Sequence, residues 1–196
     1  MTYPEYAKVG DKKYKINTDF RVAIACNEIA LDKTIGDFER SLAIIYKLFG
    51  DEGLNDFENH EKLQEIALKY LSCGKDLTYD RDESEPDMDY VEDEGYIRSS
   101  FKYDYKYDPY ELDYLHWYDF YNDLCNLSNS EFGSCCILSR IRNLRTYDLK
   151  TITDAKEREK VRKAKESVQL KRFRKETKLT KEQIESMEKL NSILGL

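Results

Sequence analysis

The side chains with the greatest potential for chemistry are carboxylates that cluster between positions 80 and 89. They are Asp80, Asp82, Glu83, Glu85, Asp87 and Asp89. Calcium would suit such a cluster, but an EF-hand loop needs glycine at its sixth position and glutamate at its twelfth. Counted from Asp80, those positions hold Glu85 and Val91. The spacing therefore predicts a solvated acidic loop and no metal site.

Histidine and cysteine, which commonly act as metal ligands or nucleophiles, show no spacing typical of either role. Neither His60 nor His116 belongs to an H-x-x-x-H or H-E-x-x-H pattern. The cysteines form no C-x-x-C pair, and the sequence has no phosphate-binding loop and no G-x-S-x-G pattern. We therefore expect a protein that is not an enzyme and needs no cofactor. We also expect its cysteines to be reduced core residues: Cys26, Cys73, Cys125, Cys135 and Cys136.

Basic side chains gather toward the C-terminal end. Residues 140–196 carry 17 Lys and Arg against 9 Asp and Glu, whereas residues 1–139 carry 15 against 30. One helix there could contact nucleic-acid phosphates through Lys160, Arg162, Lys163 and Lys165. Glutamates at positions 157, 159 and 166 lie among these cations, as in a solvated helix with ion pairs. Nucleic-acid binding is therefore only the alternative, and the charge division also favours association of one copy's basic end with another copy's acidic body.

A tyrosine-rich stretch, FKYDYKYDPYELDYLHWYDFY, runs from Phe101 to Tyr121. Asp108 and Pro109 predict the start of a helix that continues to about Leu127. Its core face would be Tyr110, Tyr114, Trp117, Tyr121 and Leu124. Before it, tyrosines alternate with charged residues, and we expect these to be the part that contacts a partner: Tyr103, Tyr105 and Tyr107.

The elements that must position these residues are mainly helical. The hydrophobic periodicity predicts a mainly α fold with a compact multi-helix body over residues 1–150. This body would include a short N-terminal β-hairpin at 6–16 and a flexible acidic loop at 76–87. A charged helical C-terminal extension would follow at 151–196, with its last helix at 180–194.

Several helix boundaries follow from capping and stop residues. Asn17, Thr18 or Asp19 would cap the first helix, and Gly50 would end a second helix that starts at Asp37. That second helix would turn Phe38, Leu42, Ile45, Tyr46 and Phe49 inward. A later helix, opened by Ser84 and Pro86, would run to about Lys102, and a neighbouring element would approach closely at its interior Gly95. A further helix, capped by Asn129 or Ser130, would carry Phe132 and Ile141.

The sequence shows no apolar run of the roughly 18 to 20 residues that a membrane-spanning helix needs. Its first residues, MTYPEYAKVGDKKYK, lack the apolar segment of a signal peptide. We therefore expect a cytoplasmic protein that does not contact membranes.

Three blocks resemble a known family. They are DMDYVEDEGYIRSSF from Asp87 to Phe101, LHWYDFYNDL from Leu115 to Leu124, and RIRNL from Arg140 to Leu144. Together they are similar to the bacteriophage gene-product-fifteen family, although Tyr118 stands where that family often has a second tryptophan. The matching positions, which we expect to be structural, are Asp87, Asp89, Tyr90, Asp93, Tyr96, Ile97, Ser100, Phe101, Leu115, His116, Trp117, Phe120 and Arg142.

The resemblance implies a tail assembly chaperone or accessory factor of a long-tailed phage or prophage, encoded ahead of the tape-measure gene. Such a factor would bind the long helical tape-measure protein, and other tail assembly factors, in the cytoplasm of the bacterial host. It would be absent from the mature virion. Self-association would be compatible with this role.

Overall fold

The structure is a computed structural model, and it describes residues 3–75, 86–129 and 135–173. In chain order its elements are β1 (Tyr6–Val9), β2 (Lys12–Lys15), α1 (Phe20–Leu31), α2 (Asp37–Leu54), η1 (Phe57–Asn59), α3 (His60–Leu71), α4 (Glu94–Asp104), η2 (Pro109–Glu111), α5 (Trp117–Cys125), α6 (Ile137–Thr146), η3 (Leu149–Thr151), α7 (Ala155–Val168) and η4 (Lys171–Phe173). The η elements are short 3₁₀-helices. The prediction of a mainly α fold with an N-terminal hairpin is confirmed.

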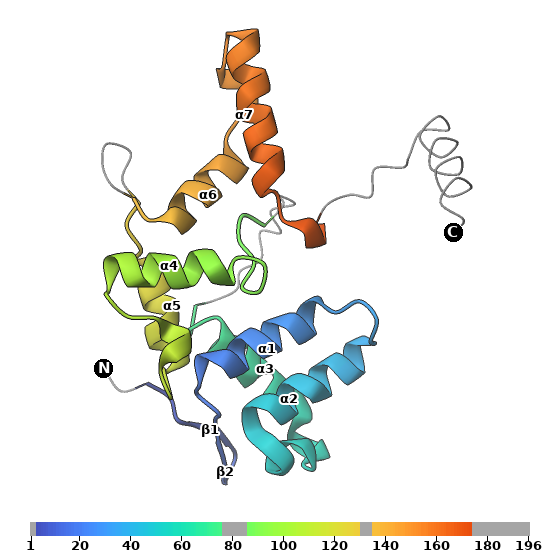
Figure 1. Ribbon diagram of the computed structural model, residues 1–196. Helices are drawn as coiled ribbons and strands as arrows, with labels where there is room; N and C mark the ends of the chain where they lie inside the picture. Colours follow the sequence, from blue (N-terminus) through green and yellow to red (C-terminus); the bar gives the residue numbers. More distant parts are fainter. Residues whose placement is uncertain (1–2, 76–85, 130–134, 174–196) are drawn as a thin grey trace, which may run out of the picture.

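The hairpin and helices α1 to α3 form one end of the molecule, α4 and α5 lie in the middle, and α6 and α7 form the opposite end (Figure 1). The acidic loop expected at 76–87 lies outside the described residues except for its last two positions. The helix expected at 180–194 lies entirely outside them.

The hairpin β1–β2 is antiparallel and pairs Ala7 with Tyr14. Gly10 occupies its turn with φ of 60°, a left-handed conformation that glycine adopts without steric cost. Ala7, Val9 and Tyr14 are buried because the hairpin leans on α2 and α3. A two-stranded sheet alone would be marginally stable, so these helices supply its support.

Helix α1 begins where Asp19 caps it, because the Asp19 carboxylate accepts the Arg21 N–H at 2.8 Å. Helix α2 reaches Leu54, but Gly50 has non-helical backbone angles, with φ of 67°, and divides α2 into two helical segments. The first of these segments ends at the expected stop. The inward face of α2 is Ile44, Ile45, Leu48 and Phe49. The prediction that Phe38 and Tyr46 face the core is wrong: their side chains are 67% and 48% exposed.

Helix α4 begins at Glu94, later than expected, because Asp89 folds the preceding residues into a turn. The Asp89 carboxylate accepts the N–H groups of Val91 and Glu92, each at 2.8 Å. The prediction that an element approaches Gly95 is also wrong, since nothing lies within 4 Å of a Cβ placed there.

The continuous helix expected from Asp108 to Leu127 is interrupted. Asp108 and Pro109 do open a helical turn, but η2 ends at Glu111 and α5 begins only at Trp117. The residues between them run along the start of α1: the Phe20 N–H donates to the Leu115 carbonyl at 3.0 Å, and the Trp117 N–H donates to the Thr18 carbonyl at 2.8 Å. A backbone that pairs with another segment in this way cannot remain helical.

The interior between these elements is aromatic. The rings of Phe20 and Phe120 stack with their centroids 4.4 Å apart, and Phe101 stacks on Phe120 at 5.4 Å. All three side chains are fully buried. They join α1, α4 and α5 into one core.

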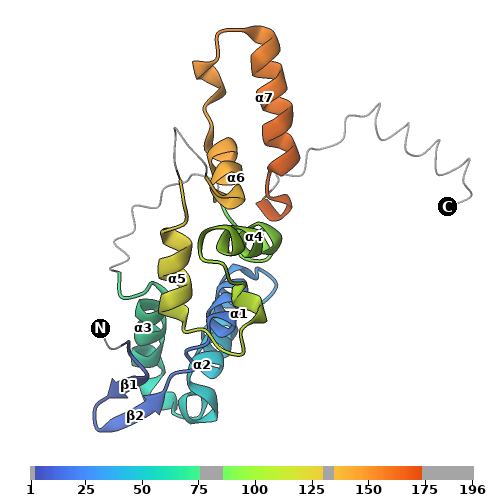
Figure 2. The same ribbon diagram turned by 60° about the vertical axis from the view of Figure 1, so that its left-hand side comes forward.

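Helix α6 starts at Ile137, after Cys136, so the cap expected at Asn129 or Ser130 is wrong; Phe132 lies outside the described residues. Helix α7 is capped by Asp154 and packs along α6 of the same chain (Figure 2). None of its residues is buried. Among the described residues, no helix combines the length and apolar character needed to cross a membrane.

Candidate functional site

The acidic family block forms a bidentate ion pair with an arginine on α6. Arg145 donates from both terminal nitrogens to the two oxygens of Asp93, at 2.6 and 2.8 Å. Asp93 also accepts the Asp89 N–H at 3.0 Å. Both side chains are almost fully buried. A bidentate pair of this kind fixes the orientation of α6 on the turn before α4.

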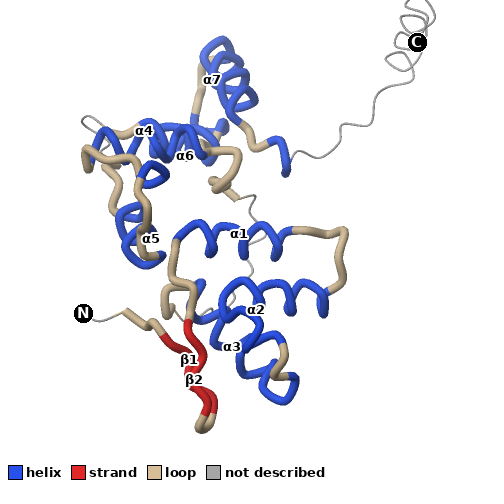
Figure 3. Tube along the Cα trace, turned by 60° about the horizontal axis from the view of Figure 1, so that its bottom comes forward, coloured by secondary structure: helices blue, strands red, loops and turns tan. Residues whose placement is uncertain are grey.

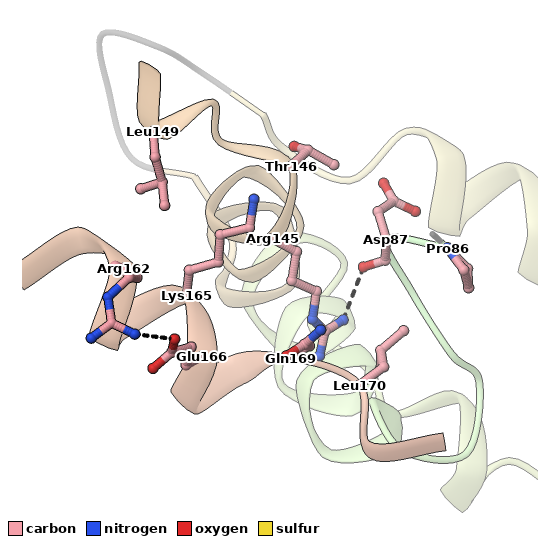
Figure 4. Close-up of a pocket in the computed structure, with 10 residues that line it drawn as sticks. All are labelled: Pro86, Asp87, Arg145, Thr146, Leu149, Arg162, Lys165, Glu166, Gln169 and Leu170. Carbon is pink, nitrogen blue, oxygen red and sulfur yellow. Dashed lines mark hydrogen bonds and ion pairs between the residues drawn. The ribbon is translucent and has the colours of Figure 1, made fainter. Parts of the chain in front are cut away.

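Arg145 also donates hydrogen bonds to backbone carbonyls of two other segments. It donates to the carbonyls of Asp87 at 2.9 Å and Val168 at 2.7 Å, and so joins the acidic block to the end of α7 (Figure 4). Arg142, one turn earlier, pairs with the Asp87 carboxylate at 2.8 Å nearer the surface. The matched residues Asp87, Asp93 and Arg142 therefore hold helices together, as expected of structural residues.

Beside this network lies a cleft of about 250 Å³ between α6 and α7. Apolar side chains line part of it, and charged and uncharged polar side chains line the rest (Figure 4). Its principal lining residues are Pro86, Leu149, Leu170, Arg145, Arg162 and Lys165. Each of the three cations already has a protein partner: Asp93 for Arg145, Glu159 for Arg162 and the Tyr147 carbonyl for Lys165. The cleft therefore does not present an unpaired cation for an anionic ligand.

The C-terminal part of the described chain is fastened to the acidic block by Arg172. This side chain donates to both oxygens of Glu28 on α1, at 2.8 and 2.7 Å, and lies 3.1 Å from Asp89. The Glu92 carboxylate accepts the N–H groups of Lys171 and Arg172 at 2.7 and 2.6 Å. This contact was not predicted, because counts of charged residues along a sequence do not indicate which charged side chains pair in the folded chain.

The aromatic family block lies inside the molecule. Trp117 and Phe120 are buried, and the Trp117 indole N–H donates to the Leu71 carbonyl at 3.2 Å. His116 caps α5 by accepting the Tyr118 N–H on Nδ1 at 3.0 Å, and burial lowers the pKa of its imidazole. Leu115 pairs with Phe20 through its backbone. These positions have structural tasks.

The remaining matched positions in the first block surround the same core. Ser100 donates to the Tyr96 carbonyl at 2.7 Å and accepts the Leu138 N–H at 3.1 Å, which ties α4 to α6. Ile97 is fully buried, like Phe101, and Tyr90 lies edge-on to Trp117 with ring centroids 6.1 Å apart.

The tyrosines before Asp108 do not form one exposed strip. Tyr105 and Tyr107 pack edge-on against Phe101 and donate to the carbonyl and the carboxylate of Asp123, at 2.9 and 2.6 Å. Burial raises the pKa of both phenols. Only Tyr103 is largely exposed. The interpretation of all three as a contact strip is therefore corrected for Tyr105 and Tyr107, and partner contact by Tyr103 stays a prediction.

The four cations proposed as nucleic-acid contacts lie on α7 but do not form one free row. Arg162 donates to Glu159 and Glu166 of its own helix, and Lys163 lies 3.6 Å from Glu159. Lys165 turns toward α6, where it donates to the Tyr147 carbonyl at 3.0 Å. Lys160 points outward, with no ion pair to any described residue. This arrangement is typical of a solvated helix, so it weakens the nucleic-acid alternative.

Three aromatic side chains that the sequence predicted to lie in the core are exposed on α2 and beside it: Phe38, Tyr46 and Tyr114. Phe38 and Tyr46 are separated by two helical turns, and Tyr114, 54% exposed, lies near Tyr46. We call Phe38, Tyr46 and Tyr114 the aromatic stripe. Tyr46 and Tyr114 line a groove of about 620 Å³ together with Ile16 and with Thr18, whose hydroxyl lies 2.6 Å from the Tyr114 hydroxyl. Phe38 and Tyr46 are eight residues apart, which is close to two helical turns. This spacing would have predicted an exposed pair if the core face of α2 had been known.

The described residues contain no group of three or more His, Cys, Asp or Glu side chains that could hold a metal ion. The cysteines in this part of the chain are free thiols. Cys26 and Cys136 are buried, and burial raises the pKa of Cys26 to about 12. Cys125 is exposed, so the prediction that every cysteine lies in the core is wrong there.

The fold and these contacts define a mainly helical protein held together by an aromatic core and a buried ion pair, with an aromatic stripe on its surface. Residues 4–170 match the family described as Bacteriophage Gp15 protein, and the chain belongs to that family. It is thus a phage protein, and the resemblance read from the three blocks is confirmed. Comparison with curated proteins and with solved structures gave no match.

Proposed function

We propose that this chain is a non-enzymatic tail assembly chaperone or accessory factor that binds the phage tape-measure protein during tail morphogenesis. It would act in the cytoplasm of the bacterial host, alongside other tail assembly factors, and would be absent from the mature virion. Family membership over residues 4–170 supports a phage role. The structural observation that carries the proposal is the aromatic stripe.

The stripe presents exposed aromatic side chains of the kind that bind a helix from a partner. Amphipathic helices dock by placing apolar anchors, spaced three or four residues apart, into an apolar groove. Phe38 and Tyr46 are exposed two turns apart on α2, about 12 Å along the helix axis. Tyr46 and Tyr114 border a groove whose lining also includes polar and charged residues, among them Lys15, Lys47 and Asp51. A long helical protein with an apolar line would cover these rings and shield its own apolar line from water.

The residues that match the family motif are not candidates for the surface that binds the tape-measure protein. Asp93 and Phe101 are occupied by contacts inside the molecule. The exposed rings of the stripe lie outside both the acidic and the aromatic block, although Tyr114 directly precedes Leu115. Replacement of stripe residues should therefore remove binding without unfolding the protein, since surface substitutions usually change stability by less than about 0.5 kcal/mol.

The test is co-expression of the chain with the tape-measure protein encoded next to it. We expect the two to co-purify, and we expect the chain to increase the soluble fraction of its partner. Phe38→Ser with Tyr46→Ser should lower co-purification at least tenfold. The matched control is Val91→Ser with Tyr147→Ser, which removes two comparably exposed apolar side chains elsewhere and should leave co-purification unchanged.

A tape-measure protein that neither co-purifies with the native chain nor becomes more soluble would contradict the proposed function. Equal loss in the stripe and control variants would instead contradict the placement of the site. Tyr103→Ala provides a further comparison, because a loss of binding there would support the contact predicted from the sequence.

A further inference from the structure

The outward face of α7 carries a row of lysines. Lys156, Lys160 and Lys163 follow one another at four and three residues, so they share one side of the helix, and all three are exposed. The opposite side, with Val161 and Val168 half-buried, faces α6. Lys156 and Lys160 form no ion pair with any residue that the structure describes. Their charges therefore remain available to a partner.

The outward face of α3 carries acidic side chains, opposite in charge to the lysine row of α7. Leu63, Ala67 and Tyr70 are the buried residues of α3. On the side turned away from them, Glu61 and Glu65 are exposed, and no ion pair within the described chain engages either carboxylate.

Large apolar side chains border these carboxylates at both ends. Phe57, in the turn that leads into α3, is 71% exposed, and Leu68 is 45% exposed. Lys62 precedes Glu65 by three residues and Lys69 follows it by four, so both lysines lie beside Glu65 on one flank of this face, whereas Glu61 and Leu68 lie farther from them.

The two faces cannot meet within one molecule. Helix α3 lies with α1, α2 and the hairpin at one end, whereas α7 lies with α6 at the other, in each of three views (Figures 1, 2 and 3). The end of α7 is also held in place, since Arg145 donates to the Val168 carbonyl. Contact between the two faces requires two copies of the chain.

We propose that copies of this chain associate head to tail, with the lysine row of α7 (Lys156, Lys160 and Lys163) on the acidic and apolar face of α3 (Phe57, Glu61, Glu65 and Leu68) of the next copy. The spacing matches, because charges four residues apart on a helix are about 6 Å apart on both surfaces. Phe57 and Leu68 would be covered by the aliphatic parts of the lysine side chains.

This contact joins two different surfaces, so each added copy leaves one α3 face and one α7 face open. Such an interface continues into a ring or an open helical assembly. Because exposed charges supply much of the attraction, association should weaken as salt shortens the Debye length from about 10 Å at 0.1 M to about 3 Å at 1 M. The proposal concerns contacts between copies and does not depend on tape-measure binding.

The test is a charge exchange followed by sedimentation velocity over a range of protein concentrations at low salt. Lys156→Glu with Lys160→Glu makes both faces acidic, and Glu61→Lys with Glu65→Lys makes both basic. Each variant alone should remain monomeric where the native chain associates. Mixed in equal amounts, the two variants should associate again, because each acidic face then meets a basic one.

The control is Lys8→Glu with Lys33→Glu, which changes the net charge as Lys156→Glu with Lys160→Glu does, at exposed positions outside both faces, and should leave association unchanged. Circular dichroism would verify that every variant is folded. A native chain that stays monomeric at all concentrations would overturn the proposal, and so would a mixture that does not recover association. Loss of tape-measure or DNA binding in these variants, with native self-association retained, would assign the faces to those partners and also overturn it.

Discussion

The pair formed by Asp93 and Arg145 is a buried contact that holds α6 against the turn before α4. Removal of one partner from a buried, hydrogen-bonded ion pair leaves an uncompensated charge and typically costs about 3–5 kcal/mol. Arg145→Ala would leave Asp93, which is 1% exposed, without its guanidinium. We therefore expect a loss of this size in the free energy of unfolding, measured by urea denaturation at pH 7.

Arg142→Ala is the matched control, because it removes an arginine from the same helix that pairs with an acid of the same block. The pair of Arg142 and Asp87 is partly exposed, and such pairs contribute up to about 1 kcal/mol. Equal losses of unfolding free energy in Arg145→Ala and Arg142→Ala would contradict the claim that a buried pair contributes more than a partly exposed one.

Single residues show why the site could be predicted only in part. The block from Asp87 to Phe101 was recognisable as a family motif, but the task of Asp93 was not, because its partner Arg145 is 52 positions away. A local pattern indicates which residues are acidic. It does not indicate which of them will be buried with an arginine from another helix.

At the scale of elements, α5 depends on an imidazole as its cap. Nδ1 of His116 accepts the Tyr118 N–H only while it is unprotonated. Burial lowers the pKa of His116 below its ordinary value of 6.5, so the folded state favours the neutral form. The stabilisation is therefore complete above about pH 6.5 and is lost as the pH falls through the lowered pKa.

His116→Asn tests this cap, because asparagine is a good N-cap that does not titrate in this range. We expect its free energy of unfolding to fall less steeply between pH 7.5 and about 5 than that of the native chain. His116→Ala, which has no capping group, should cost about 1 kcal/mol at pH 7.5. An unchanged slope in His116→Asn would contradict the role of the cap.

The same region shows the limit of helix prediction. Asp108 and Pro109 were correctly recognised as the start of a helical turn, since capping is a local property. The break before Trp117 was not recognised, because it results from backbone bonds between residues 18–20 and 115–117. Likewise, the apolar residues of α2 allow more than one inward face, and only packing against α1 and α3 selects Ile45 and Leu48 over Phe38 and Tyr46.

At the scale of the whole molecule, Arg172 connects the two ends. The chain leaves the body at α6, extends through α7 and returns to α1 and the acidic block, where Arg172 bonds Glu28 and Asp89. The sequence predicted an acidic body and a basic extension, and the structure shows that part of this complementarity is used within one chain. Leu170, buried beside Arg172, adds an apolar contact to the same junction.

Arg172→Ala should loosen this junction without unfolding the body, because α7 has no buried residue of its own and depends on its two ends. We expect amide hydrogen exchange in residues 155–173 to accelerate several-fold, while exchange in α1 to α3 changes little, since local opening follows the stability of each segment. Lys163→Ala removes an exposed cation from the middle of α7 and should leave the exchange of residues 169–173 unchanged. If Arg172→Ala exchanged like the native chain, the ion pairs of Arg172 would have no part in holding the basic extension against the acidic body.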